Sequence, residues 1–405
     1  MVVVAVDGPA GRYVPRVAEV RPIRVLQLAD LVNRHDFIDV IVEHADPRRV
    51  DVSVATFGRT PNIAEPGYAE RGVAAADLGA ASGRRAYPRA LHRLRRLLSA
   101  WRIDVVHCHH YDPAVLTWLA TRGTSVPVVV GRHHSDAIEL DTTGLRRWAY
   151  LALERRVLAA AAATVVPSTM IAGLVEAQGV RRDRVHLVPY AFVAAKYEHA
   201  RSVDVAAVRR SLGLDRDDFV VGTFARLYAD KGHRYLLAAV AELVPTCPDL
   251  RWLVVGEGAE RAGLESQVRA AGLGRHVRLA GWRRDVPDLV AACDVVVQPT
   301  LQEAFSQVMG EAMWLERPLV MTDVSGATDI IDDGVNGFVV PRRDPAALAA
   351  AIRRLRADEP LRRSVAAAGR RWVTTELTPE RIVPRYEAVY EQVVSGRAGR
   401  RARPR

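Results

Sequence analysis

The sequence predicts an α/β protein built from two doubly wound, Rossmann-like domains that face each other across a central cleft. Its 405 residues exceed one ordinary hydrophobic core, so two domains of roughly 150 to 200 residues each are expected. Short apolar runs recur between helix-like stretches, which is typical of parallel strands covered on both faces. Each run is followed by a glycine, proline, serine or aspartate and then by a helical period, as in repeating βα units. A polar segment near residues 196–218 separates the two halves.

The apolar runs define the expected strands. In the first half we expect strands at residues 23–29, 52–57, 105–109, 126–130, 164–166 and 185–188. In the second half we expect them at residues 220–225, 252–255, 277–279, 294–298 and 318–321. The domains are placed at residues 1–195 and 215–375, and a helix within residues 376–395 is expected to return to the first domain. Ligands of such sheets bind beyond the carboxyl ends of the strands, so the chemistry is expected in the cleft.

Composition limits the class of protein. Apolar residues make up 49% and charged residues 26% of the chain, a balance that allows a core in each domain and argues against global disorder. There is no run of about 18 uncharged apolar residues and no secretory signal pattern, so a cytoplasmic location is expected. Cys108, Cys247 and Cys293 are far apart and lack metal-binding spacing. They argue against a disulfide framework or a structural zinc site and agree with a reducing compartment.

The net charge of +10 comes almost entirely from arginine. Of the 57 basic residues two are lysines, Lys196 and Lys231, and the other 55 are arginines. Such a bias reflects a coding preference and does not indicate nucleic-acid binding. Five arginines lie in the last nine residues without an acid, so residues 396–405 are expected to form a disordered basic tail.

The most informative run is residues 303–311, which follows an expected strand. Phe305 and Ser306 stand at an expected helix start, where backbone N–H groups and the positive end of the helix dipole form an anion site. Glu303 precedes the helix and Glu311 lies about a turn and a half into it, so both acids can reach a ligand from one side. Carboxylates accept hydrogen bonds well from sugar and ribose hydroxyls.

This run resembles the donor-binding motif of retaining glycosyltransferase family 4, a GT-B-fold family of the glycogen-synthase-like superfamily. The shared pattern is Glu-x-Phe-(Gly/Ser), a second Glu eight positions after the first, and then Ala-Met and a proline-led strand. The likeness is close over residues 219–356 and looser in the first half. Blocks similar to those of the family, in the same order, stand at residues 104–109, 187–189, 254–258, 277–281, 294–299 and 332–341. The resemblance implies transfer of a hexose-type sugar, with retention, from a nucleoside diphosphate, UDP by default, to a hydroxyl acceptor.

Carried over residue by residue, the resemblance implies that Glu303 contacts hydroxyls of the donor sugar and that Glu311 contacts the ribose. Arg226 and Lys231 match the basic pair that holds the donor diphosphate. Two fixed cations and a helix N-terminus can stabilise the charge that develops on the leaving phosphate, so no metal ion or other cofactor is expected.

The donor-site residues also have purely structural interpretations. Arg226 and Lys231 could belong to an exposed loop of an arginine-rich protein, and Gly256 and Gly258 could form only a tight turn. The ordered blocks favour a donor site. We expect it to comprise Arg226, Lys231, Gly256, Gly258, Glu303, Phe305, Ser306 and Glu311.

Histidines gather near the ends of two expected strands. The resemblance implies that His109 lies on the opposite cleft wall, where it orients and polarises the sugar, while the departing phosphate helps to deprotonate the acceptor. No protein nucleophile is then required, and the catalytic set is His109, Glu303, Arg226 and Lys231. The group His107, His109, His110, His133 and His134 raises the alternative of a metal cluster, but no Cys/His quartet is evident and no metal site is expected.

The acceptor side departs from the family. Relatives usually carry a Gly-Gly turn after the first strand, whereas residues 30–37 of this chain contain no glycine. The side chains of Asn33, Arg34 and His35 either contact the acceptor or form a differently packed loop. With His133 they are the acceptor-side candidates. Asp329 stands where the family usually has a glutamate, a change that bears on which donor is used.

Two further questions stay open at this level. Residues 84–102 carry seven arginines and no acid, with leucines at helical spacing. They form either a helix with a solvated basic face or a surface for peripheral docking on the anionic inner face of a membrane. The alternative functions are a sugar-nucleotide epimerase or phosphorylase on the same fold and a non-catalytic sugar-nucleotide-binding protein. The spacing of the two glutamates and the lack of an evident acid/base triad argue against the first, and binding without turnover would indicate the second.

Overall fold

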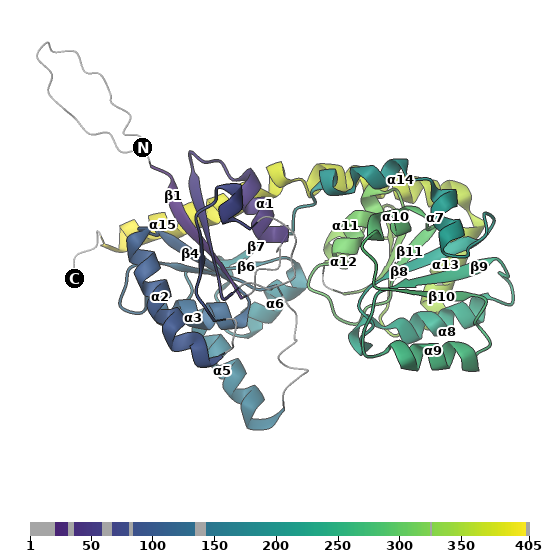
Figure 1. The fold of residues 1–405 in the computed structure, drawn as a ribbon, viewed down its shortest axis with the longest axis horizontal. Helices are drawn as coiled ribbons and strands as arrows, with labels where there is room; N and C mark the ends of the chain where they lie inside the picture. Colours follow the sequence, from purple (N-terminus) through teal and green to yellow (C-terminus); the bar gives the residue numbers. More distant parts are fainter. Residues whose placement is uncertain are drawn as a thin grey trace, which may run out of the picture.

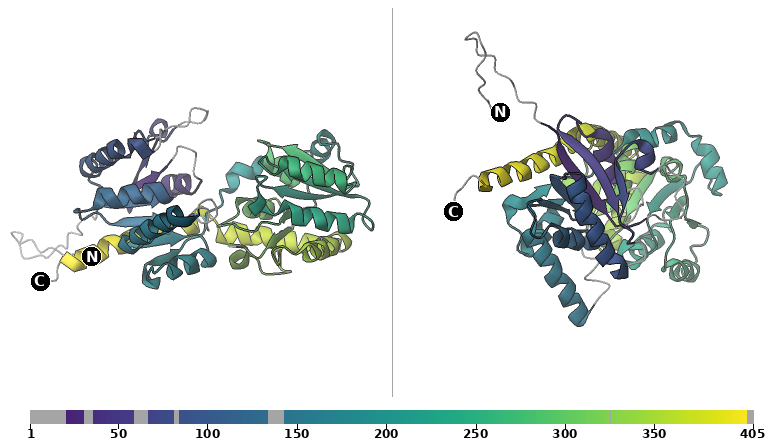
Figure 2. Two further views of the ribbon diagram at one scale, coloured as in Figure 1. Left: turned by 90° about the horizontal axis from the view of Figure 1, so that it is seen from below. Right: turned by 60° about the vertical axis from the view of Figure 1, so that its left-hand side comes forward.

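The computed structural model describes residues 21–30, 36–58, 67–80, 84–133, 143–324 and 326–401. These residues form two parallel β-sheets in two lobes that lie side by side, each sheet with helices on both of its faces (Figures 1 and 2). The expected α/β class with two doubly wound sheets is confirmed.

The first sheet has the strand order β3-β2-β1-β4-β5-β6-β7, and all of its strands are parallel. The strands are β1 (Ile23–Ala29), β2 (Val50–Thr56), β3 (Ala75–Asp77), β4 (Val105–His109), β5 (Val128–Gly131), β6 (Ala163–Val166) and β7 (Val185–Leu187). The helices of this lobe are α1 (Asp36–His44), α2 (Tyr87–Ala100), α3 (Tyr111–Thr121), α5 (Gly144–Ala160) and α6 (Thr169–Ala177). A 3-10 segment (Ala194–Ser202) and α7 (Val205–Ser211) lead to the second lobe.

The second sheet has the order β10-β9-β8-β11-β12-β13 and is also parallel. The strands are β8 (Phe219–Phe224), β9 (Leu250–Val255), β10 (Val277–Gly281), β11 (Val295–Gln298), β12 (Leu319–Thr322) and β13 (Phe338–Val340). The helices are α8 (His233–Leu243), α9 (Arg261–Ala270), α10 (Val286–Ala291), α11 (Gln307–Trp314), α12 (Ala327–Ile330), α13 (Pro345–Ala357) and α14 (Glu359–Glu376).

Every strand expected from the sequence is present, and β1 and β4 have the expected bounds. The strands β3 and β13 were not expected. Each has three residues and lies at the edge of its sheet, where it pairs with one neighbour only. β3 (Ala-Ala-Asp) buries little apolar surface and so leaves a weak apolar signal, whereas β13 (Phe-Val-Val) is apolar and partly buried but has only three residues, fewer than a typical strand.

The strand orders determine where ligands can bind. In each sheet the connections reverse direction at one place, between β1 and β4 in the first sheet and between β8 and β11 in the second. A crevice opens at the carboxyl ends of the strands at such a switch point, because the helices on the two sides lead away in opposite directions. The carboxyl ends of these four strands therefore mark the candidate site on each lobe.

The last helix, α15 (Pro379–Arg401), lies against the first lobe, where it packs on α1, β1 and β4 (Figure 1). Tyr386 and Tyr390 are buried in this contact, and Arg49 at the start of β2 pairs with Glu387 and, at 2.8 Å, with Glu391. The prediction of a disordered tail at residues 396–405 is wrong for residues 396–401, which continue the helix. Alanine and arginine are good helix formers, so a helix already held by buried tyrosines extends through them despite the charge and the two poor helix formers Gly396 and Gly399.

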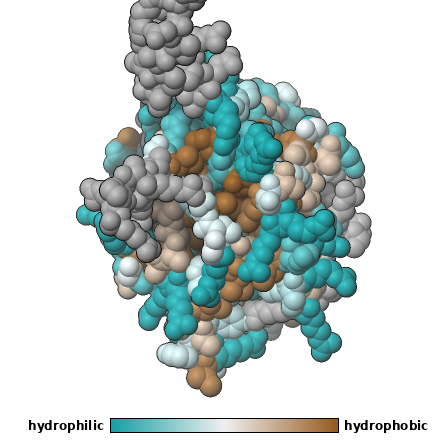
Figure 3. Space-filling view, turned by 90° about the vertical axis from the view of Figure 1, so that its left-hand side faces the viewer, coloured by the Kyte–Doolittle hydropathy of each residue, from teal (hydrophilic) through white to brown (hydrophobic). Residues whose placement is uncertain are grey.

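The basic segment 84–102 contains helix α2, which buries Ala90, Leu94, Leu97 and Leu98 and exposes Arg89, Arg93, Arg95 and Arg96. This arrangement agrees with a helix packed on the first lobe with a solvated basic face. Figure 3 shows this end of the molecule, where hydrophobic patches alternate with a mostly hydrophilic surface. Within the described residues, no helix is both long and apolar enough to cross a lipid bilayer.

Candidate active site

Three loops meet at the carboxyl edge of the second sheet, following β8, β9 and β11. Backbone hydrogen bonds join them: Leu227 N donates to Glu257 O at 2.9 Å, and Leu301 N donates to Asp230 O at 2.6 Å. Gly256 adopts a φ of 143°, and an added Cβ would lie 2.0 Å from the Ala225 carbonyl oxygen. The loops therefore pack backbone against backbone.

Gly258 lies in the same contact. An added Cβ would lie 2.3 Å from the Leu227 carbonyl oxygen, so only glycine fits. Loop packing accounts for the need for glycine at positions 256 and 258. Contact of either residue with a donor stays a prediction.

The predicted basic residue Lys231 and the predicted sugar contact Glu303 lie together. The Lys231 ammonium is 2.9 Å from Glu303 Oε2 and 3.5 Å from Asp230 Oδ2, and it donates to the Gln302 carbonyl at 3.4 Å. The side chains of Lys231 and Glu303 are 13% and 27% exposed, so the pair is partly buried but open to a ligand. Arg226 lies in the same loop as Lys231, is exposed, and holds its guanidinium over the Tyr228 ring.

Helix α11 begins at Gln307, next to the predicted start. Ser306 is its N-cap residue, with extended backbone angles, and Phe305 is 8% exposed. The N–H groups of the first helical turn have no acceptor within the helix, so they are directed at the space in front of it. Glu311 lies one turn further on and is 9% exposed. The predicted donor residues of positions 303–311 are thus placed around one helix start.

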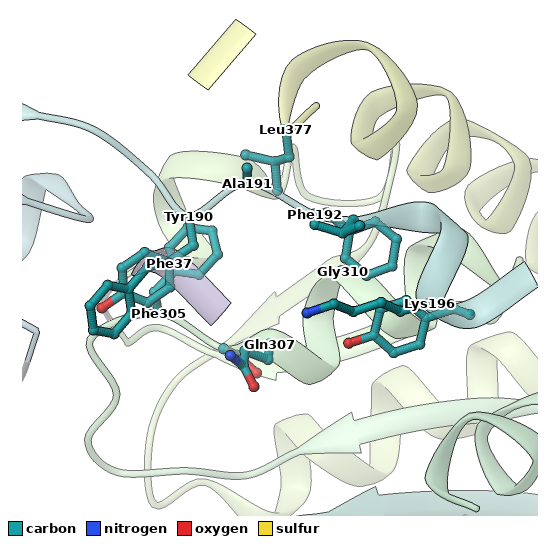
Figure 4. A pocket seen from close by; sticks show the side chains of 12 residues that line it. Phe37, Tyr190, Ala191, Phe192, Lys196, Phe305, Gln307, Gly310 and Leu377 are labelled. Atoms are coloured by element: carbon teal, nitrogen blue, oxygen red, sulfur yellow. The ribbon is translucent and has the colours of Figure 1, made fainter. Parts of the chain in front are cut away.

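A pocket lies in front of this helix start, between the two lobes (Figure 4). The second lobe contributes Phe305, Ser306, Gln307 and Gly310, and the first lobe and the segment that follows it contribute Phe37, Tyr190, Phe192, Lys196 and Tyr197. Figure 4 shows the Lys196 side chain extending in the direction of Gln307, and the rings of Phe37, Tyr190 and Phe305 gathered at one end. The ring centroids of Tyr190 and Phe305 are 5.1 Å apart, so aromatic side chains of both lobes touch here.

His109 and His133 come together on the first-lobe side. His109 Nδ1 is 2.7 Å from His133 Nε2, His109 Nε2 is 2.8 Å from Gln27 Oε1, and His133 Nδ1 is 2.6 Å from the Tyr190 hydroxyl. His109 is fully buried, and the Phe37 ring stacks on His133 at 4.1 Å. His109 therefore contacts its neighbours with both ring nitrogens, and Tyr190 is the outermost group of the cluster.

His107 lies in the core and is fully buried. Its Nδ1 is 2.8 Å from the Tyr390 hydroxyl, and burial lowers its pKa to about 3, so the ring is neutral. Direct nitrogen–nitrogen contact between His109 and His133 leaves no room for an ion between those two atoms. Among the described residues, no group of three or more His, Cys, Asp or Glu side chains has the geometry to hold a metal ion. His134 and the acceptor-side candidates Asn33, Arg34 and His35 lie outside the described residues.

Comparison with known proteins assigns the chain to a family. A family model described as "Glycosyl transferase 4-like domain" matches residues 35–191, and one described as "Glycosyl transferases group 1" matches residues 218–358. An alpha-D-kanosaminyltransferase of Streptomyces kanamyceticus is 31% identical over 290 residues, which are 68% of this chain and 72% of the relative. The chain belongs to the family 4 glycosyltransferases. A D-inositol 3-phosphate glycosyltransferase of Catenulispora acidiphila is also 31% identical, over 320 residues, 73% of this glycosyltransferase and 74% of the relative.

Solved structures confirm the GT-B fold of this glycosyltransferase. Sucrose-phosphate synthase from Thermosynechococcus elongatus superposes with a TM-score of 0.76 at 20% identity, covering 92% of this chain and all of that one. The Anabaena protein HepE, solved in complex with UDP and glucose, gives a TM-score of 0.73 at 20% identity, covering 90% of this chain and 99% of that one.

Several residues at the site of this glycosyltransferase escaped the sequence analysis. Gln27, Tyr190 and Tyr390 join the histidine cluster, and a polar residue within the buried part of strand β1 was the available signal for Gln27. His233 lies in the second lobe, two residues after Lys231. It follows Gly232 at the start of α8, is 4% exposed, and within the described residues neither ring nitrogen has a hydrogen-bond partner.

The two lobes of this glycosyltransferase also meet through Asp329, at the position that departs from the family. Asp329 accepts hydrogen bonds from the backbone N–H of Thr169, at 2.7 Å, and from its hydroxyl. Thr169 is the first residue of α6, so a carboxylate of the second lobe satisfies a first-turn donor of a first-lobe helix.

Proposed function

We propose that this chain is a retaining hexosyltransferase that moves a sugar from a UDP-sugar to a hydroxyl acceptor without a divalent ion. The observation that carries the proposal is the placement of Lys231, Glu303 and the start of helix α11 around one space at the carboxyl edge of the second sheet. The pocket between the lobes lies at the same helix start, where Phe305, Ser306 and Gln307 face aromatic side chains of the first lobe. A diphosphate, a ribose and a sugar need a cation, an anion site and carboxylate acceptors, and all three are present there.

In this reaction the bond between the anomeric carbon and the β-phosphate oxygen breaks, and a bond from the acceptor oxygen to the same face of that carbon forms. The proton of the acceptor hydroxyl passes to the departing phosphate. Arg226, Lys231 and the first-turn amides of α11 stabilise the negative charge that grows on the phosphate. Glu303 receives hydrogen bonds from the sugar and Glu311 from the ribose, which fixes the anomeric carbon for attack.

The first lobe forms the acceptor wall in this proposal. His109 is held inside the cluster, so it acts on the sugar through His133 and Tyr190. The choice of UDP is supported by HepE, a protein of the same fold that was solved in complex with UDP and with UDP-glucose. We further propose a cytoplasmic location with peripheral docking of the basic face of α2 on an anionic membrane. Liposome flotation with and without anionic lipid tests the docking.

A thermal-shift panel of nucleoside diphosphates and their sugars tests the proposal first. UDP and one UDP-sugar should raise the melting temperature most, because a ligand that binds only the folded state stabilises it. Transfer to a panel of hydroxyl acceptors, with the anomeric configuration of the product read by NMR, then tests retention. Binding without turnover on any acceptor would indicate the non-catalytic alternative, and a product with inverted configuration would contradict the retaining mechanism.

A further inference from the structure

A continuous row of hydrogen bonds runs from helix α15 to the pocket between the lobes. The amide nitrogen of Gln27 donates to the Tyr390 hydroxyl at 3.0 Å, and the amide oxygen of Gln27 lies 2.8 Å from His109 Nε2. His109 Nδ1 and His133 Nε2 are 2.7 Å apart, and His133 Nδ1 and the Tyr190 hydroxyl are 2.6 Å apart. The row has five members from distant parts of the sequence. Two lie on strands (β1 and β4), two lie just after strands (β5 and β7), and one lies on helix α15.

The inner half of the row is sealed from solvent. Gln27, His109 and Tyr390 are fully buried, whereas His133 and Tyr190 are partly exposed. Leaving a buried polar group without its hydrogen-bond partner lowers the stability of the fold by about 1–3 kcal/mol. Each group in the row therefore fixes its neighbour as either a donor or an acceptor.

The amide of Gln27 sets the direction of the row. An amide oxygen only accepts hydrogen bonds, so His109 carries its proton on Nε2 and its Nδ1 has a lone pair. His133 Nε2 must then donate to His109 Nδ1, which leaves His133 Nδ1 as an acceptor. The Tyr190 hydroxyl donates to that nitrogen. At the inner end the Tyr390 hydroxyl, which accepts from Gln27, donates to His107 Nδ1 at 2.8 Å.

We propose that Gln27, held by Tyr390, is a positioning residue that fixes His109 and His133 as Nε2–H tautomers, so that Tyr190 faces the cleft as a hydrogen-bond acceptor for a substrate hydroxyl. The only proton of the phenol is directed inward, and the lone pairs of its oxygen remain for a ligand. Such a group favours a hydroxyl and disfavours a phosphate or carboxylate oxygen at that place. The last step rests on the proposed function, since it places the substrate in this pocket.

The surroundings of Tyr190 agree with this role. Burial raises the pKa of Tyr190 well above its ordinary value, with smaller contributions from Tyr386 and Glu303, so the phenol keeps its proton. The ring is held between aromatic neighbours, with centroid distances of 5.7 Å to Phe37 and 5.1 Å to Phe305. Tyr190 and Glu303 both offer lone pairs to hydroxyls.

The tautomers are measured by long-range proton–nitrogen NMR on the full chain labelled with ¹⁵N-histidine, with His109→Gln and His133→Gln used for assignment. We expect both residues to carry the proton on Nε2. Gln27→Leu removes the acceptor and Tyr390→Phe removes the partner of the amide, so each should abolish the single His109 tautomer. Gln27→Glu keeps an acceptor and should retain it. Tyr386→Phe is the matched control for the His109 tautomer, because Tyr386 is buried on the same helix and its ring lies 5.9 Å from that of His107, outside the row described above.

An Nδ1–H tautomer of His109 in the wild type, or unchanged tautomers in both Gln27→Leu and Tyr390→Phe, would overturn the inference. If Gln27→Leu does not fold, the wild type and Tyr390→Phe decide it. Hydrolysis of UDP-glucose, with water as the hydroxyl, should fall about tenfold in Tyr190→Phe at unchanged affinity for UDP. Equal hydrolysis rates would overturn the role of Tyr190. If the wild type neither hydrolyses a UDP-sugar nor transfers its sugar to any acceptor, the proposed function fails, while the tautomers still decide the role of Gln27.

Discussion

Lys231 and Glu303 form an ion pair, with Nζ and Oε2 2.9 Å apart, although 72 residues separate them in the chain. One comes from the loop after β8 and the other from the loop after β11, the two strands at the switch point of the second sheet. The pair ties the cation proposed for the diphosphate to the carboxylate proposed for the sugar. In this proposal, the two side chains contact a bound donor on both sides of the bond that breaks, Lys231 at the diphosphate and Glu303 at the sugar.

Replacement of Lys231 by methionine should reduce turnover of the UDP-sugar strongly. The charge that grows on the leaving phosphate loses a partly buried cation, and the loss of one such group typically lowers kcat by about 10²–10³-fold. Lys231→Arg keeps the charge and should restore part of the activity. Arg278→Met, an exposed cation on β10, is the control and should match the wild type. A wild-type kcat in Lys231→Met would contradict the assignment.

Replacement of Glu311 by glutamine should weaken binding of UDP. A hydrogen bond to a buried carboxylate contributes more than one to a neutral amide, so the dissociation constant should rise about tenfold or more. Isothermal titration calorimetry measures this directly. Glu265→Gln, on the surface of α9, provides the matched change without an effect on affinity. Equal affinities of the two variants for UDP would remove Glu311 from the nucleoside site.

Gly131 makes room for the histidine cluster at the end of β5. An added Cβ would lie 2.6 Å from His133 Nε2 and 2.8 Å from His109 Nδ1, closer than real contacts allow. Gly131→Ala should therefore lower the free energy of unfolding by about 1–3 kcal/mol. Gly173→Ala, in the exposed face of α6 with nothing within 4 Å, should raise it by about 0.5–1 kcal/mol. Urea unfolding of both variants measures the difference, and a Gly131→Ala protein as stable as the wild type would show that the cluster is loosely packed.

Acid should destabilise the fold through two buried histidines. Burial lowers the pKa of His107 to about 3, and burial with a further contribution from Lys231 lowers the pKa of His233 to about 4, against an ordinary value of 6.5. Below about pH 6.5 the unfolded chain binds more protons than the native chain, so stability falls as the pH drops toward these folded-state values. Each residue contributes up to about 1.4 kcal/mol per pH unit in that range.

Urea unfolding at about pH 7 and about pH 5.5 measures this dependence. His107→Gln and His233→Gln should each flatten it, while carboxylates titrate equally in all three proteins. An identical pH dependence in the wild type and both variants would mean that the pKa values of His107 and His233 are not lowered in the native state.

Much of the fold, and the placement of the candidate donor residues in the loops of the second sheet, could be predicted from the sequence. A strand such as β8 or β11 is an apolar run with a turn after it, so the repeating pattern predicted both the sheet and the loops that carry Lys231 and Glu303. The same pattern predicted the helix start at Ser306. The surrounding sequence blocks occur in the same order as in the family, and this order indicated a donor site.

The acceptor side could not be predicted in the same way. Gln27, His109, His133, Tyr190 and Tyr390 lie on five elements, and their contacts depend on strand order and on where α15 lies, which local periodicity does not encode. The need for glycine at position 131 becomes evident only in the structure, where three imidazoles surround it. The basic end of α15 was misjudged because charge was weighed above helix propensity and the anchoring of Tyr390.

The most direct test of the account is the affinity for UDP, measured by calorimetry in excess EDTA and again with manganese, for the wild type and for Arg226→Met/Lys231→Met. We expect the wild type to bind equally under both conditions and the double variant to bind at least about a hundredfold more weakly under both. Binding that disappears in EDTA and returns with manganese, or a double variant with wild-type affinity, would contradict the claim that side chains and helix amides of the second lobe hold the diphosphate.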